Sequence, residues 1–258
     1  MRVISVQLDI AWEDKDTNHA KVRRLLDARP DLEDSLIVLP EMFSVGFSMN
    51  VPAVVEPPDG PTHTFLSQLA RQHGAWVLGG VVTPDPGGLG RNEAIAYHPE
   101  GIEIARYCKM HPFTLGGESK CYAAGTCPVV FDCREFRVAP FICYDLRFPE
   151  VFRKATRLGA ELFVVIANWP TARIHHWTAL LKARAIENQA FVVGVNRCGT
   201  DPTLTYTGGS IVVDPHGTVI ADAGTEEGIT VAKLDKKLLQ TYRAEYPFLA
   251  DMRDPSRT

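Results

Sequence analysis

Apolar and polar positions along the chain alternate in two ways, and each predicts its own kind of element. Short runs that are almost wholly apolar predict buried strands at residues 3–8, 36–39, 75–82, 136–142, 162–167 and 190–196. Between these runs apolar residues recur at helical spacing, which predicts helices over residues 17–28, 62–73, 149–158 and 175–188. Strands that alternate with helices in this way are typical of parallel sheets covered by helices.

Two hairpins interrupt the alternation and indicate an internal repeat. Residues 92–98 and 102–108 flank a Pro-Glu-Gly turn, and residues 209–213 and 218–221 flank Asp-Pro-His-Gly. Each hairpin follows two strand–helix units, so the chain reads as two similar halves. We therefore expect one α/β domain over residues 1–258, built as a four-layer α-β-β-α sandwich with two pseudo-symmetric halves.

The end of the chain is predicted to close this fold and then leave it. A strand at residues 229–234 and a helix at 235–242 complete the sandwich. A C-terminal tail over residues 245–258 carries aromatic side chains at Tyr246 and Phe248 but has no regular pattern. We expect this tail to pack on a partner subunit.

Composition narrows the class of protein. The chain is 45% hydrophobic and 22% charged, which is ordinary for a globular protein, and its formal net charge is −4. No block of Lys or Arg is present, so we expect neither nucleic-acid binding nor binding to an anionic membrane. The first apolar stretch is too short for a signal peptide or a membrane span, which makes a cytoplasmic protein the expectation.

Six cysteines call for an explanation. Three disulfides are not needed by a chain of this length with a full core. A metal site is not expected either, because Cys121, Cys127 and Cys133 stand six residues apart, outside the usual gap between zinc ligands. We expect most of these thiols to be inert and buried.

Three ionisable residues each follow a predicted strand directly. Glu41 follows residues 36–40, Lys109 follows residues 102–108, and Cys143 follows residues 136–142 at a turn from strand to helix. If these strands are parallel neighbours, the three side chains gather at one end of a sheet, where ligand sites of α/β proteins tend to lie.

The chemistry of the three groups is complementary. Cys143 is a candidate nucleophile, which attacks best as a thiolate. Glu41 can accept its proton and later pass it to a leaving amine. Lys109, together with the backbone N–H of Tyr144, can neutralise the oxyanion of a tetrahedral intermediate.

The segments around these residues resemble a known family. Leu-Pro-Glu41-Met-Phe, Lys109-Met-His-Pro-Phe and Phe-Ile-Cys143-Tyr-Asp-Leu-Arg-Phe-Pro-Glu look like the three signature segments of the nitrilase superfamily of carbon–nitrogen hydrolases. The resemblance covers nearly the whole chain and is greatest to the omega-amidase branch, which includes the YafV-type amidases. It implies the α-β-β-α sandwich, a Glu-Lys-Cys triad, no cofactor and a homodimer.

The resemblance also implies a role for each matching residue. Cys143 attacks the carbonyl carbon of a primary amide, Glu41 acts as general base, and Lys109 holds the oxyanion. Ammonia leaves, and water then releases the acid from a thioester on Cys143. Glu118 matches the second glutamate of the family and is expected to orient Lys109 or the substrate; the alternative is a loop carboxylate that pairs with Lys120.

The omega-amidase branch implies a small-molecule substrate, a short dicarboxylate monoamide such as 2-oxoglutaramate or 2-oxosuccinamate. Its far carboxylate suits an arginine, whose planar guanidinium pairs bidentately with carboxylates. Arg173, which follows the strand end at Asn168 and Trp169, is the preferred carboxylate ligand, and Asn168 is a further candidate for contact with the substrate. Phe43 and Trp169 are expected to wall a small apolar slot, with a place in the core as the alternative for either aromatic.

Arg147, four residues after the nucleophile, is the second candidate for the far carboxylate. It fits equally well as a structural residue paired with Asp145 or Glu150.

Other functions stay open at this point. Another small amide is possible, such as deaminated glutathione, a carbamoyl-amino acid or an aliphatic amide, and so is a nitrile. A non-catalytic binding module is disfavoured because Glu41, Lys109 and Cys143 are all present. A thiol redox protein would need a Cys-x-x-Cys pair, which is absent from the sequence. The helix after Cys143 and the tail are the candidate dimer interface.

Overall fold

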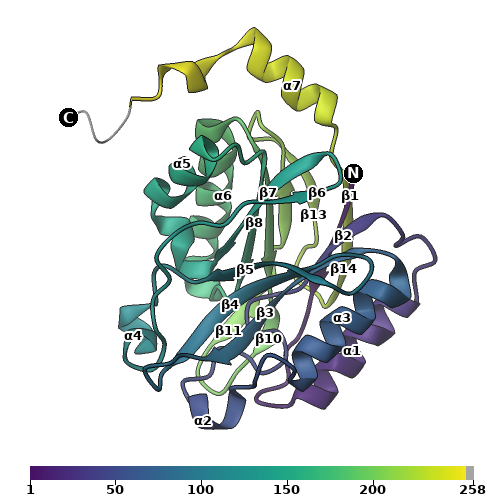
Figure 1. The fold of residues 1–258 in the computed structure, drawn as a ribbon, viewed down its shortest axis with the longest axis vertical. Coiled ribbons are helices and arrows are strands. Elements are labelled where there is room, and N and C mark those ends of the chain that lie inside the picture. The colour runs from purple at the N-terminus through teal and green to yellow at the C-terminus, as the bar shows by residue number, and fades with distance from the viewer. Residues whose placement is uncertain (254–258) are drawn as a thin grey trace.

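The computed structural model describes residues 1–253 and contains two six-stranded sheets (Figure 1). The strands of the first sheet are β1 (Arg2–Gln7), β2 (Ser35–Val38), β3 (Trp76–Pro84), β4 (Gly90–Tyr97), β5 (Glu103–Cys108) and β14 (Gly228–Lys233). Those of the second are β6 (Phe131–Cys133), β7 (Phe136–Ile142), β8 (Leu162–Ala167), β9 (Phe191–Asn196), β12 (Ile211–Val213) and β13 (Val219–Asp222).

The two sheets repeat the same strand order. The first runs β14-β1-β2-β3-β4-β5 and the second, read from the opposite edge, runs β6-β7-β8-β9-β12-β13. In each sheet three consecutive parallel strands are followed by an antiparallel hairpin, and an antiparallel strand closes the other edge. The prediction of two pseudo-symmetric halves is confirmed.

Helices cover the outer face of each sheet. In Figure 1, α1 (Lys15–Asp27) and α3 (Pro61–His73) lie together against the first sheet, and α5 (Pro149–Arg157) and α6 (Ile174–Asn188) lie together on the second. Alternate side chains of a strand point to opposite faces of its sheet. Accordingly Leu36 and Val38 of β2 join the core between the sheets, whereas Ile37 joins the layer under α1 and α3. The predicted four-layer α-β-β-α sandwich is confirmed.

The ends of the first two long helices follow ordinary capping chemistry. The carboxylate of Asp14 accepts a hydrogen bond of 3.0 Å from the Thr17 N–H and so caps α1. Helix α3 begins at Pro61, which has no N–H to leave unpaired, and ends at Gly74, whose φ of +57° is the left-handed cap that glycine adopts most easily.

Several short elements lie outside the predicted set. The long loops contain α2 (Val51–Val54) and α4 (Glu118–Cys121), and a two-stranded sheet is formed by β10 (Cys198–Thr200) and β11 (Thr205–Thr207). Elements of three or four residues carry too few positions for a periodic pattern, so long-range contacts decide them.

The described part of the chain closes with α7 (Lys236–Glu245) and a short 3-10 helix, η4 (Phe248–Asp251), which run along one end of the molecule (Figure 1). Leu239 is fully buried, and the Arg243 side chain donates to the carbonyls of Gln189 and Ala160. Residues 254–258 of the predicted tail lie outside the described residues. Among residues 1–253, no helix combines the length and the apolar character that crossing a membrane requires.

Candidate active site

Glu41, Lys109 and Cys143 converge on one site, but not as ends of neighbouring strands. Glu41 follows β2 and Lys109 follows β5, which are separated by β3 and β4 in the first sheet, whereas Cys143 follows β7 in the second sheet. The premise that their strands are parallel neighbours is therefore wrong. The residues meet because the two sheets pack face to face.

Cys143 sits on a strained turn. It is the first residue of a 3-10 helix, η2 (Cys143–Arg147), and its φ of +43° is rare for a residue with a side chain. A sharp strand-to-helix turn of this kind exposes a nucleophile at the end of a sheet. The thiol donates a long hydrogen bond of 3.9 Å to the carbonyl oxygen of Asn168, and the side chain lines a cavity.

The carboxylate of Asp145 fastens this turn to the segment around Lys109. Its Oδ2 accepts from the N–H of Ile142 at 3.1 Å and from the hydroxyl of Tyr107 at 2.8 Å. Its Oδ1 accepts from the backbone N–H of His111 at 2.9 Å. One buried carboxylate thus holds the nucleophile turn of one sheet against the strand end of the other.

Lys109 lies between two carboxylates. Its Nζ is 2.9 Å from Oε1 of Glu41 and 2.8 Å from Oε2 of Glu118. All three side chains are at most 1% exposed, and two carboxylates with one ammonium leave one net negative charge in the cluster. The structure therefore brings Glu118 to Lys109 rather than to Lys120.

Burial and these charges set the protonation states. Burial raises the pKa of the Cys143 thiol well above its ordinary value; the Glu41 carboxylate raises it further and the Lys109 ammonium lowers it. Burial alone would lower the pKa of Lys109, but Glu118 and Glu41 outweigh it, so this pKa is raised. The resting site thus holds a protonated thiol beside a charged lysine, and the thiol needs a base.

Asn168 links the nucleophile to the candidate base. Its backbone N–H donates to Oε2 of Glu41 at 2.8 Å, and its side-chain amide donates to the Glu41 carbonyl at 2.8 Å. Its own carbonyl oxygen accepts a hydrogen bond from the Cys143 thiol. Asn168 therefore contacts both groups between which a proton would move.

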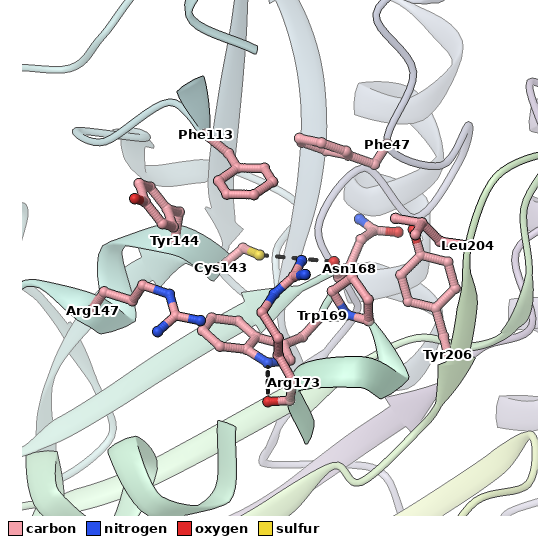
Figure 2. Close-up of a pocket in the computed structure, with 11 residues that line it drawn as sticks. Phe47, Phe113, Cys143, Tyr144, Arg147, Asn168, Trp169, Arg173, Leu204 and Tyr206 are labelled. Carbon is pink, nitrogen blue, oxygen red and sulfur yellow. Dashed lines mark hydrogen bonds between the residues drawn. The ribbon is translucent and has the colours of Figure 1, made fainter. Parts of the chain in front are cut away.

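A cavity of about 40 Å³ opens beside Cys143, a volume that limits its occupant to a small molecule. Figure 2 shows the side chains that line this cavity. They are Phe47, Phe113, Cys143, Tyr144, Arg147, Asn168, Trp169, Pro170, Arg173, Leu204 and Tyr206.

Both predicted arginines line this cavity. The Arg147 guanidinium lies 4.9 Å from the Trp169 ring and its NH2 is 3.3 Å from Nδ1 of His176, while Arg173 lies 5.8 Å from the Phe113 ring. Within residues 1–253 neither arginine forms an ion pair with a carboxylate, so the alternative that pairs Arg147 with Asp145 or Glu150 finds no support. The Trp169 indole N–H donates to the Arg173 carbonyl at 2.8 Å, which anchors the indole in the wall (Figure 2).

Phe43 does not line the cavity. It is fully buried in the layer between the first sheet and its helices, where its ring packs 6.0 Å from that of Phe65. The chain turns sharply at Met42, whose φ is +45°, and the next aromatic, Phe47, reaches the cavity instead. The expected place of Phe43 in the cavity wall is therefore corrected to its stated alternative, the core.

Further residues of the site were missed by sequence reasoning. Phe113 and Tyr206 line the cavity from loops and a short strand that have no periodic pattern. Asn92 of β4 contacts both carboxylates of the buried cluster. Its one signal in the sequence was a polar side chain just before the apolar run of residues 94–97.

The described residues do not form an obvious metal site. Over the described residues 1–253, no group of three or more His, Cys, Asp and Glu side chains is arranged to hold an ion. All six cysteines, which lie within this range, are free thiols.

Comparison with known proteins identifies the class. The family model described as Carbon-nitrogen hydrolase matches residues 2–244, and the chain belongs to this family. The predicted resemblance to carbon–nitrogen hydrolases of the nitrilase superfamily is confirmed.

Individual relatives place the chain more narrowly. It is 33% identical to a 2-oxoglutaramate amidase of Bacillus subtilis, covering 96% of each chain. It is 35% identical to the omega-amidase YafV of Escherichia coli K12, covering 97% of this chain and 96% of the relative. A crystal structure of a CN-hydrolase superfamily protein from Xanthomonas campestris, with an arsenic adduct in its active site, superposes with a TM-score of 0.92 at 34% identity over 98% of this chain and 97% of that one. The predicted resemblance to the omega-amidase branch is confirmed.

Proposed function

We propose that this protein is an omega-amidase that hydrolyses the terminal amide of short dicarboxylate monoamides, of the 2-oxoglutaramate or 2-oxosuccinamate type. One observation carries the choice of substrate: two arginines, Arg147 and Arg173, line the cavity of Cys143 and have no carboxylate partner among residues 1–253. A guanidinium at an apolar wall is a strong ligand for a carboxylate. The names of the relatives support the same substrate class.

The first half-reaction forms a thioester. Glu41 takes the thiol proton as the sulfur of Cys143 attacks the amide carbon. The oxyanion that develops accepts from Lys109 and from the N–H of Tyr144, which as the second residue of η2 has no partner within its helix. Glu41 then passes its proton to the nitrogen, the C–N bond breaks, and ammonia leaves.

The second half-reaction returns the enzyme to its starting state. Glu41 takes a proton from water, whose oxygen attacks the thioester carbon. The C–S bond breaks, the sulfur regains a proton from Glu41, and the carboxylic acid is released. Glu118 orients Lys109 for both steps, since its two oxygens lie 3.0 and 2.8 Å from Nζ in the resting site.

Ammonia release from a panel of compounds tests the proposal. The panel consists of 2-oxoglutaramate, 2-oxosuccinamate, glutamine, asparagine, butyramide and a simple nitrile. We expect one of the oxo-acid amides to give a kcat/KM at least about tenfold above butyramide, because one charged hydrogen bond is worth about that factor. Butyramide at an equal rate would favour an aliphatic amidase, which the aromatic walls Phe47 and Phe113 also fit.

The nucleophile has its own control within the same assay. Cys143→Ala is expected to release no ammonia while its circular dichroism matches that of the unaltered protein. Turnover by this variant would refute Cys143 as the nucleophile. Cys133→Ala, at a buried free thiol outside the cavity, is the matched control and should keep its activity.

We also propose that the chain forms one domain with the tail 245–258, acts as a homodimer and works in the cytoplasm. The core cluster that spans both sheets supports a single domain. Exposed apolar side chains on the tail and at the end of α5, the helix after Cys143, support a dimer, with Phe248 56% and Leu158 50% exposed. Six free thiols are typical of a reducing compartment.

A further inference from the structure

Asn92 occupies the centre of the buried charge cluster. Its side-chain Nδ2 lies 2.7 Å from Oε1 of Glu41 and 2.9 Å from Oε1 of Glu118, and the residue is 1% exposed. One primary amide therefore gives both of its N–H groups to carboxylates, one to each. The opposite amide orientation would set its oxygen against two carboxylate oxygens, so the contacts fix the orientation.

Lys109 donates to the same two oxygens. Its Nζ lies 2.9 Å from Oε1 of Glu41 and 3.0 Å from Oε1 of Glu118. Each of these buried oxygens thus has two donors, one on a charged and flexible side chain and one on a neutral side chain fixed in a strand. Each oxygen therefore has a spare donor only as long as Lys109 stays in its resting position.

The proposed reaction removes that redundancy. To stabilise the oxyanion, Lys109 must turn an N–H from a carboxylate toward the substrate. A buried carboxylate oxygen left without a donor would be strongly destabilised. Asn92 keeps a donor on each Oε1 throughout, so Lys109 can move its hydrogen bond at low cost.

The charge of the residue matters as much as its donors. A second cation at this position, in addition to Lys109, would hold Glu41 too firmly as a carboxylate to accept the thiol proton. An acid would add a third carboxylate to a cluster that already has one net negative charge. A neutral double donor meets both requirements.

We infer that Asn92 is a positioning residue that bridges Glu41 and Glu118, keeps Glu41 ready to accept a proton, and frees Lys109 to bind the oxyanion. This inference rests on the proposed amidase function. Asn92 is not among the residues that line the cavity, so it acts through Glu41 and Lys109 and not on the substrate. It should therefore govern kcat and its pH dependence, and leave KM nearly unchanged.

The test is the pH profile of kcat/KM for Asn92→Leu and Asn92→Asp, measured with the best amide of the panel. Loss of the donor makes protonation of the carboxylate cluster easier, so the midpoint of the acid limb should rise by about one pH unit in Asn92→Leu. It should rise further in Asn92→Asp, which adds a negative charge. We expect kcat to fall about 10- to 100-fold and KM to change less than about twofold.

A second measurement does not depend on turnover. The rate at which iodoacetamide alkylates Cys143, followed by mass spectrometry of its peptide, reports transfer of the thiol proton at each pH. Its acid limb should shift with that of kcat/KM. If the unaltered protein released no ammonia from any amide, the proposed function would fail, yet the alkylation profiles would still decide the role of Asn92.

The matched control is Asn188→Leu. Asn188 is equally buried and donates to the Arg184 carbonyl at 3.0 Å, and it touches neither carboxylate of the cluster. This control should lose stability without any change in the midpoint of the acid limb. Profiles of both Asn92 variants that superpose on that of the unaltered protein, whatever their kcat, would reduce Asn92 to a structural residue and overturn the inference.

Discussion

At the scale of single residues, the site contains two kinds of charged side chain: those that form ion pairs with one another and those that do not. Glu41, Lys109 and Glu118 satisfy one another in a buried cluster. The guanidinium groups of Arg147 and Arg173 face the cavity and have no carboxylate partner among residues 1–253. The first set is suited to chemistry at one end of a substrate, and the second to recognition of an anion at the other end.

Arg173→Ala should separate recognition from chemistry. We expect KM for a carboxylate-bearing amide to rise about 10- to 100-fold, because a charged hydrogen bond contributes about 1.5–3 kcal/mol. KM for butyramide should change little, since that substrate has no carboxylate. Steady-state kinetics on both substrates gives the answer, and an equal effect on the two would exclude Arg173 as the carboxylate ligand.

At the scale of elements, α1 is held to the rest of the first half by an aromatic stack. The ring of His19 on α1 lies 4.2 Å from that of Phe65 on α3, and the two planes differ by 3°. Burial lowers the pKa of His19 to about 4. The imidazole is therefore neutral in the folded protein at neutral pH, and its protonation opposes folding.

This contact predicts a specific acid sensitivity. Between pH 6.5 and about 4 the unfolded chain binds a proton at His19 that the folded protein does not. The free energy of unfolding should therefore fall as pH drops through this window, and the loss should be absent above it. His19→Phe keeps the stack without the titration, so denaturant melts at several pH values should give a smaller loss for the variant. Equal losses for both proteins would contradict this account.

At the scale of the whole molecule, the packing of two equivalent sheets creates the site. Lys109 comes from the first sheet and Cys143 from the second, and Asp145 joins their segments through Tyr107 and His111. Neither half contains the full set of reactive groups. Activity should therefore require the complete sandwich.

The proposed dimer is tested at the same scale. Phe248, an aromatic residue of the tail, is 56% exposed, and Phe248→Asp replaces it with a charged side chain. If the tail packs on a partner subunit, light scattering after size exclusion should give about half the mass found for the unaltered protein, because burying an unpaired charge is costly. Leu115→Asp changes an apolar residue that is 88% exposed and lies outside the tail, and it should leave the mass unchanged. A single mass for all three proteins would remove the tail from the interface.

Much of this molecule follows from the order of its residues alone. Apolar periodicity determined the long elements because strands and helices bury side chains at different intervals, and those intervals are written directly in the sequence. The predicted strand at residues 136–142 coincides with β7, and the predicted helix at 175–188 differs from α6 by one residue. Glu41, Lys109 and Cys143 were found because each reactive side chain directly follows such a strand.

Only the tertiary structure decided which side chains face one another. Phe43 lies in the core and not in the cavity because the backbone reverses at Met42. Asn92 belongs to the site because it contacts Glu118, which is 26 residues away in the chain. Contacts of this kind form between elements whose separation in sequence has no regular period. The sequence by itself determined the elements and the reactive groups, and face-to-face packing of the two sheets determined their partners, because a side chain's environment is set by all the layers that meet around it.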